Sequence, residues 1–143
     1  MLTIDANVFV SAATPTEIFH ADSDRLLTRV GSAGLEIVCP ALILPETASG
    51  IVRPTSDTIA GQQGVTRIVT FPNLVLATLT EDQAERAAQI AIDFRLRGAD
   101  AVYVAVAQEY GTTLITWDQE LLTRGIAAVP TLTPTGWLAA NPI

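Results

Sequence analysis

Short apolar runs alternate along this chain with longer segments of helical pattern. Apolar strands that alternate with helices indicate a parallel sheet covered by helices on both faces. We therefore predict an α/β/α sandwich with a parallel sheet of about five strands. The runs expected to form the strands are Leu2–Ile4, Glu36–Cys39, Leu74–Ala77, Thr113–Thr116 and, as an edge strand because of Pro130, Val129–Leu132.

Caps and stop signals between these runs predict where the helices begin and end. Asp57 is a candidate cap for a helix that continues to about Val69, and Thr80 opens a capping box with Gln83 three residues later. Pro45 disfavours helical geometry at Leu44 and suits a first helical turn, so we expect Glu46 near the N-terminus of a helix that follows the second strand. The other expected helices are the segment around Val8–Val10, His20 to about Val30, Arg97–Tyr110, a short helix at Leu121 and Leu122, and Pro134 to Ala140.

The size and charge of the chain limit what it can be. Its 143 residues, 49% of them hydrophobic and 16% charged, are expected to form one globular domain over 1–143. The formal net charge of −7 argues against nucleic-acid binding through a basic field, although an enzyme can meet phosphates through bound cations. All basic residues are arginines, which excludes mechanisms that need a lysine.

The chain carries no pattern for export or membrane insertion. Its first five residues lack the basic region of a signal peptide, and no uncharged apolar run approaches the ~20 residues of a membrane helix. Cys39 is the only cysteine, so no disulfide can form within the chain, and it is most simply a core residue. We expect a soluble, cytoplasmic protein with no membrane partner.

Four acidic residues from separate segments are predicted to meet at one edge of the sheet. Ligands of parallel α/β sheets bind beyond the carboxyl ends of the strands. Asp5 directly follows the first strand, Asp118 lies at the exit of the fourth, and Glu46 lies early in the helix after the second. The helix that carries Asp100 enters the fourth strand through the tight turn Gly111–Thr112, which places Asp100 at the same edge.

Such a gathering of carboxylates favours a bound cation. Two carboxylates about 5 Å apart repel by about 3 kcal/mol at an effective dielectric constant of 20. A helix N-terminus offsets only about 0.3–1 kcal/mol of this repulsion. A hard divalent cation with oxygen ligands, Mg²⁺ or Mn²⁺, resolves it. In the alternative, the acids are spread along the edge as solvated helix caps.

The ordered set of motifs resembles the PIN-domain family, and within it the VapC-like toxin ribonucleases of bacterial toxin–antitoxin pairs. The motifs are Asp5–Ala6–Asn7, Pro45–Glu46, Arg97–Gly98–Ala99–Asp100–Ala101 and Leu114–Ile115–Thr116–Trp117–Asp118. The resemblance implies a sheet of order 3-2-1-4-5, with the first and fourth strands adjacent.

The resemblance also implies a function. Asp5, Glu46, Asp100 and Asp118 match the acidic site that binds one or two Mg²⁺ or Mn²⁺ ions, and Asn7 and Thr116 match polar supporting positions. The implied activity is cleavage of RNA phosphodiester bonds by an endoribonuclease. The implied partners are an antitoxin that covers the acidic groove, often by inserting an arginine, and a second copy of the chain in a homodimer.

Several further residues have a functional and a plain structural interpretation. Glu120 is a candidate water-mediated helper, although an exposed acid at a helix start is the simpler expectation. Trp117 and Tyr103 could stack on a base, but both lie in apolar segments and are expected in the core. The lone His20 is expected at the surface or at a helix start. Arginines that could contact RNA phosphates or simply be solvated are Arg53, Arg95 and Arg97.

Two other functions compete with the nuclease. A phosphoacceptor receiver domain also gathers aspartates at strand ends, but the absence of lysine and the lack of an aspartate after the third strand count against it. A catalytically silent PIN-like domain that binds only a metal or a partner is the second alternative. The presence of all four acids argues against it without removing it.

Overall fold

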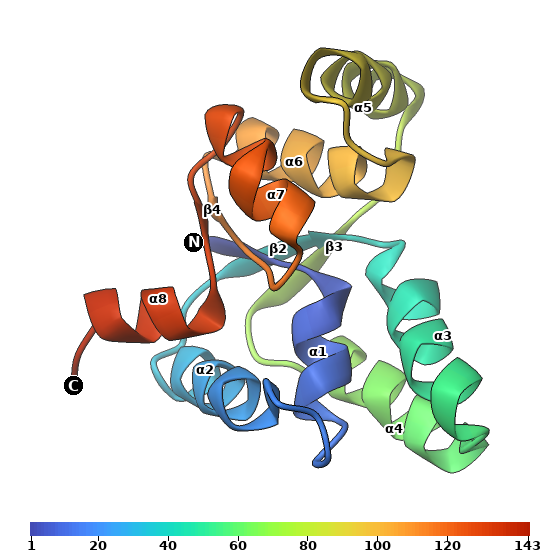
Figure 1. The fold of residues 1–143 in the computed structure, drawn as a ribbon, viewed down its shortest axis with the longest axis vertical. Helices are drawn as coiled ribbons and strands as arrows, with labels where there is room; N and C mark the ends of the chain where they lie inside the picture. Colours follow the sequence, from blue (N-terminus) through green and yellow to red (C-terminus); the bar gives the residue numbers. More distant parts are fainter.

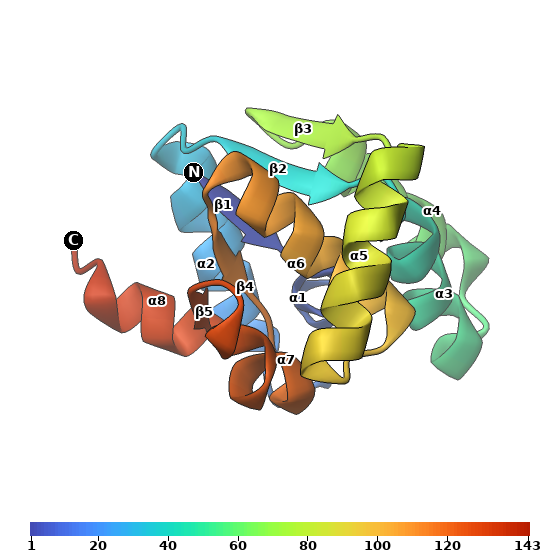
Figure 2. The same cartoon turned by 90° about the horizontal axis from the view of Figure 1, so that it is seen from above.

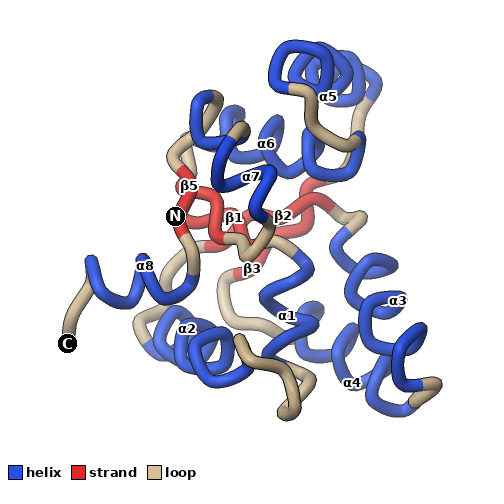
Figure 3. Tube along the Cα trace, viewed as in Figure 1, coloured by secondary structure: helices blue, strands red, loops and turns tan.

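The computed structural model describes residues 1–143 and contains a five-stranded sheet between two layers of helices (Figure 1, Figure 3). All strand pairs are parallel and the strand order is β3-β2-β1-β4-β5. The expected sheet and its order are confirmed. The strands are β1 (Leu2–Ile4), β2 (Ile37–Pro40), β3 (Leu74–Ala77), β4 (Thr113–Ile115) and β5 (Thr131–Leu132).

Helices cover both faces of this sheet. One face carries α5, α6 and α7, and the other carries α1, α2, α3, α4 and α8 (Figure 1). No helix is both long enough and apolar enough to span a membrane. The helices are α1 (Ala6–Ala12), α2 (His20–Ser32), α3 (Ile43–Thr55), α4 (Thr58–Val69), α5 (Glu81–Phe94), α6 (Gly98–Tyr110), α7 (Gln119–Thr123), the 3₁₀ helix η1 (Gly125–Ala127) and α8 (Pro134–Ala140).

The strand order separates this sheet from that of receiver domains. Receiver-type sheets have the order 2-1-3-4-5, in which the third strand lies beside the first. Here β1 lies between β2 and β4, and β3 is an edge strand that ends at Ala77. The receiver alternative is therefore wrong.

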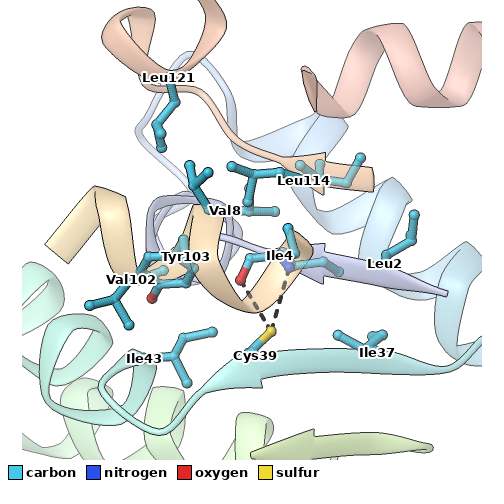
Figure 4. Close-up of a cluster of buried hydrophobic side chains, with 14 of the residues drawn as sticks. Leu2, Ile4, Val8, Ile37, Cys39, Ile43, Val102, Tyr103, Leu114 and Leu121 are labelled. Atoms are coloured by element: carbon cyan, nitrogen blue, oxygen red, sulfur yellow. Dashed lines mark hydrogen bonds between the residues drawn. The ribbon is translucent and has the colours of Figure 1, made fainter. Parts of the chain in front are cut away.

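The core is built around β1, β2 and α6. Ile4, Ile37 and Cys39 are fully buried between the layers, and the Cys39 thiol donates to Ile4 O at 3.2 Å (Figure 4). Burial raises the pKa of this thiol to about 12, so Cys39 is a neutral core residue as predicted. In α6 every side chain from Asp100 to Ala107 is buried.

The start of α3 differs from the expectation. The helix begins at Ile43, so Leu44 is helical although it precedes Pro45. Pro45 lies in the first turn of the helix, where its missing N–H costs nothing because the first four N–H groups have no partner within the helix. Burial of Ile43 in the core favours the earlier start. Glu46 lies in the first turn, as predicted.

Glycines in α4 let it pack closely against α3. A Cβ atom on Gly61 would lie 2.3 Å from Val52 Cγ2, and one on Gly64 would lie 2.4 Å from Ile51 Cδ1. Without a side chain at these two positions, α3 and α4 can approach each other closely.

We expect Gly61→Ala to lower the free energy of unfolding by about 1–3 kcal/mol, because a β-branched valine in a helix cannot easily rotate away from the added methyl group. Urea denaturation measures the change. Gly98→Ala is the matched control, since a Cβ there meets nothing within 4 Å. A Gly61→Ala protein as stable as the control would show that α3 and α4 separate at little cost.

Candidate functional site

Asp5 lies where β1 ends and α1 begins. Its backbone N–H donates to Ile115 O at 2.9 Å, which holds it against β4. Its carboxylate is buried, and Oδ2 accepts hydrogen bonds from Thr116 Oγ1 at 2.7 Å and Asn7 Nδ2 at 2.9 Å. Two side chains of the protein therefore hold Oδ2 of this carboxylate.

Thr116 and Asn7 also tie this carboxylate to the segment after β4. Asn7 Nδ2 donates to Thr116 Oγ1 at 3.1 Å, and Asn7 Oδ1 accepts from the Trp117 backbone N–H at 3.2 Å. Thr116 Oγ1 accepts from the Asp118 backbone N–H at 2.9 Å. The two predicted supporting residues thus connect Asp5 to the backbone that presents Asp118.

Asp118 caps α7 with one oxygen and faces the site with the other. Oδ1 accepts from the backbone N–H groups of Glu120 at 2.8 Å and Leu121 at 3.1 Å. These bonds fix the carboxylate, because the first N–H groups of a helix otherwise have no partner. Oδ2 accepts from Arg97 Nη2 at 2.5 Å.

Asp100 and Glu46 enter from the first turns of two long helices. Asp100 of α6 is 9% exposed, and its Oδ2 accepts from Arg97 Nε at 3.0 Å. Glu46 of α3 has a buried Oε1 with no hydrogen-bond partner. Because α6 turns into β4 at Gly111, which adopts the left-handed φ of 63°, the start of α6 lies at the carboxyl edge of the sheet (Figure 2).

One cavity of about 380 Å³ is lined by all four acids. Asn7 and Arg97 also line it, and Arg97 is the only basic residue among the ten lining residues. Within the site, carboxylate oxygens of Asp100, Asp118 and Glu120 lie within 4.8 Å of one another. The structure therefore brings the four predicted acids to one cavity. Glu120 does not line this cavity but lies close to Asp100 and Asp118.

The site disfavours full ionisation of its carboxylates. Burial raises the pKa of Asp5 to about 6, opposed by the Thr116 hydrogen bond and supported by the nearby charge of Asp100. Burial, with the charges of Asp5 and Asp100, raises the pKa of Glu46 to about 7. Burial also raises the pKa of Asp100, although Arg97 acts in the opposite direction. Added positive charge would relieve this cost.

The donor set fits a hard divalent cation. The cavity offers carboxylate oxygens and an amide side chain, and neither histidine nor cysteine lines it. Oxygen ligands of this kind suit Mg²⁺ and Mn²⁺, whereas structural zinc sites use thiolate and imidazole. The buried, unpartnered Oε1 of Glu46 is a further acceptor that a cation or its water could satisfy.

Arg97 and Glu120 take part in the site more closely than the sequence suggested. Arg97 was assigned either to RNA phosphates or to solvent, but its guanidinium lies among Asp100, Asp118 and Glu120. Glu120 was expected as an exposed helix-start acid, but it is half-buried and joins the carboxylate cluster. Arg53 and Arg95 are exposed and do not line the cavity.

Tyr103, Trp117 and His20 contact other parts of the fold and do not line the acidic cavity. Tyr103 is fully buried, and its hydroxyl makes no hydrogen bond of normal geometry. Trp117 stacks on Phe19 with ring centroids 4.1 Å apart, and its Nε1 donates to Ser23 Oγ. His20 begins α2, and its Nδ1 donates to Ser11 O at 3.1 Å. The expectations for Tyr103 and His20 are confirmed.

Comparison with known proteins identifies the family. The family model of the PIN domain matches residues 2–125 of this chain. The chain belongs to the PIN-domain family. The match covers β1 through α7, and so includes every acidic residue of the candidate site. No curated protein sequence matches this PIN domain significantly.

Solved structures share the fold of this PIN domain at low sequence identity. VapC20 of Mycobacterium tuberculosis, described as a sarcin–ricin loop cleaving toxin, is 16% identical with a TM-score of 0.74, over 87% of this chain and 95% of that one. A toxin–antitoxin complex from Klebsiella pneumoniae matches at 16% and 0.67, over 94% and 98%. FitAcB of Neisseria gonorrhoeae matches at 20% and 0.69, over 94% and 99%. These likenesses establish a shared fold, and the structural neighbours include VapC toxins.

Proposed function

We propose that this PIN-domain protein is an endoribonuclease that requires Mg²⁺ or Mn²⁺ and is the toxin of a toxin–antitoxin pair. The single observation that carries the proposal is the cavity in which Asp5, Glu46, Asp100 and Asp118 converge from four separate elements. The fold shared with a toxin that cleaves the sarcin–ricin loop supports RNA as the substrate. The fold shared with a toxin–antitoxin complex supports an antitoxin as the partner. A homodimer remains a prediction.

In this proposal one or two cations held by the four acids would activate a water molecule and stabilise the leaving oxygen of the phosphodiester. The chain's own residues keep the ligands in place. Thr116 and Asn7 hold Oδ2 of Asp5, which lines the cavity. The amides of α7 hold Oδ1 of Asp118, and the rigid buried body of α6 fixes Asp100.

Cleavage of an end-labelled RNA pool by metal-stripped protein tests this function. We expect no cleavage in EDTA and cleavage on addition of Mg²⁺ or Mn²⁺. The Asp100→Asn variant, purified in parallel, controls for contaminating nucleases, because a contaminant would cleave equally in both preparations. Cleavage that is independent of the cation, or equal in wild type and variant, would contradict the proposal. Cation binding without any cleavage would instead identify a catalytically silent PIN domain.

A further inference from the structure

Arg97 forms ion pairs within the carboxylate cluster of Asp100, Asp118 and Glu120. Its Nε lies 3.0 Å from Asp100 Oδ2 and its Nη2 lies 2.5 Å from Asp118 Oδ2. Glu120 Oε2 is a more distant neighbour, 3.8 Å from Nε. The guanidinium therefore occupies the space that the three closest carboxylates of the site share.

The oxygens that Arg97 holds are those a cation would need. Oδ1 of Asp118 already accepts two backbone hydrogen bonds at the start of α7, so Oδ2 is the oxygen this residue can offer to an ion. Arg97 donates to that same Oδ2. A guanidinium and a divalent cation on one oxygen would also repel each other. Arg97 must therefore leave the cluster when a cation binds there.

Arg97 can move at low cost. Its side chain is 67% exposed, whereas that of Asp100 is 12% exposed and that of Asp118 is 19% exposed. Ion pairs of an exposed arginine contribute little to stability, because water screens them and the long side chain loses conformational freedom. Gly98, the next residue, has open space around it. The acids are fixed by the fold, so the arginine is the mobile member.

We propose that Arg97 competes with the divalent cation for the acidic cluster and, once displaced, binds a phosphate of the RNA beside it. The phosphate contact rests on the proposed function, and the competition does not. Arg97 is the only basic residue that lines the cavity of a protein whose net charge is −7. Its planar guanidinium can donate two parallel hydrogen bonds to a phosphate.

A purely structural role for Arg97 predicts the opposite change in cation affinity. If the guanidinium only held Asp100 and Asp118 in their ligating geometry, its removal would loosen the site and weaken cation binding. If the guanidinium competes with the cation, its removal frees both oxygens and removes a positive charge, and binding becomes tighter.

Isothermal titration of metal-stripped full-length protein with Mn²⁺ distinguishes the two roles. We expect Arg97→Ala to tighten Mn²⁺ binding by about fivefold or more, because one positive charge is lost within a few ångströms of the ion. Arg86→Ala is the matched control: Arg86 is exposed on α5 and makes no ion pair, so its loss changes the net charge equally but should leave Mn²⁺ affinity nearly unchanged. Unchanged or weaker binding by Arg97→Ala overturns the proposal, as does a wild type that binds no Mn²⁺.

RNA cleavage at saturating Mn²⁺ tests the phosphate contact. We expect Arg97→Ala to raise KM for RNA about tenfold, the usual loss for one charge-assisted hydrogen bond, and Arg97→Lys to recover part of it. An unchanged KM overturns this half of the proposal. If wild type cleaves no RNA at all, the proposed function fails, and the Mn²⁺ titration together with RNA binding by fluorescence anisotropy still decides the role of Arg97.

Discussion

Replacing Asp5 by asparagine should reduce RNA cleavage at least about a hundredfold without unfolding the protein. Changes to residues that only support a metal ligand already cost about 10–100-fold in affinity or activity, and Asp5 is itself a proposed ligand. Asparagine keeps the shape of the side chain and an oxygen that can accept from Thr116 Oγ1, so the local hydrogen bonds can persist. Initial rates of RNA cleavage at saturating Mg²⁺ measure the loss.

The same substitution should raise the stability of the metal-free protein at pH 8. Burial raises the pKa of Asp5 to about 6, so the folded protein at pH 8 carries a charge that its surroundings disfavour. Removing that charge should increase the free energy of unfolding by up to a few kcal/mol. Urea denaturation in EDTA gives the comparison. An inactive variant that is also more stable cannot owe its inactivity to misfolding.

Asp57→Asn is the matched control for this experiment. Asp57 is exposed and caps α4 by accepting from the Ala60 backbone N–H at 2.9 Å, a role that asparagine fills equally well. We expect unchanged cleavage and stability. Normal RNA cleavage by Asp5→Asn would show that Asp5 does not have the role of a cation ligand.

The elements and the four acids could be predicted from the sequence because both depend on local patterns and topology. Apolar runs and caps locate the strands and helices, and a parallel sheet brings the residues after its strands to one edge. Asp5 follows β1 directly and Asp118 lies three residues after the end of the adjacent β4, so little freedom remains in their placement. For Asp100, the left-handed turn at Gly111 joins α6 to β4 and so places the start of α6 at the same edge of the sheet.

The roles of Arg97 and Glu120 could not be predicted in this way, because they depend on long side chains. Both residues lie at helix starts, where a solvated conformation is equally compatible with the sequence. Only the three-dimensional positions of Asp100 and Asp118 show that the guanidinium lies between them. The early start of α3 likewise follows from burial of Ile43, a tertiary effect that outweighs the local preference of the residue before Pro45.

The stability of the metal-free protein should fall as the pH rises from about 4 to about 7. The pKa of Asp5 is raised to about 6 and that of Glu46 to about 7, so in this range the folded protein retains protons that the unfolded chain has lost. The stabilising difference is complete below the ordinary carboxyl pKa and is lost as the pH passes the raised values. Asp100, whose pKa is also raised, acts in the same direction. We expect a total loss of a few kcal/mol, with Glu46 contributing less than its shift implies because it is only half-buried.

A divalent cation should reverse this loss at neutral pH, because it binds the folded, ionised site and not the unfolded chain. At a hundred times its dissociation constant, Mn²⁺ should add about 2.7 kcal/mol. Urea denaturation between pH 4.5 and 8, in EDTA and in Mn²⁺, measures both effects. The Asp5→Asn, Glu46→Gln double variant should show a flatter pH profile in EDTA and little response to Mn²⁺. A metal-free wild type that gains stability over this pH range would contradict the electrostatic account of the site, in which burial makes ionisation of Asp5 and Glu46 costly and so favours cation binding.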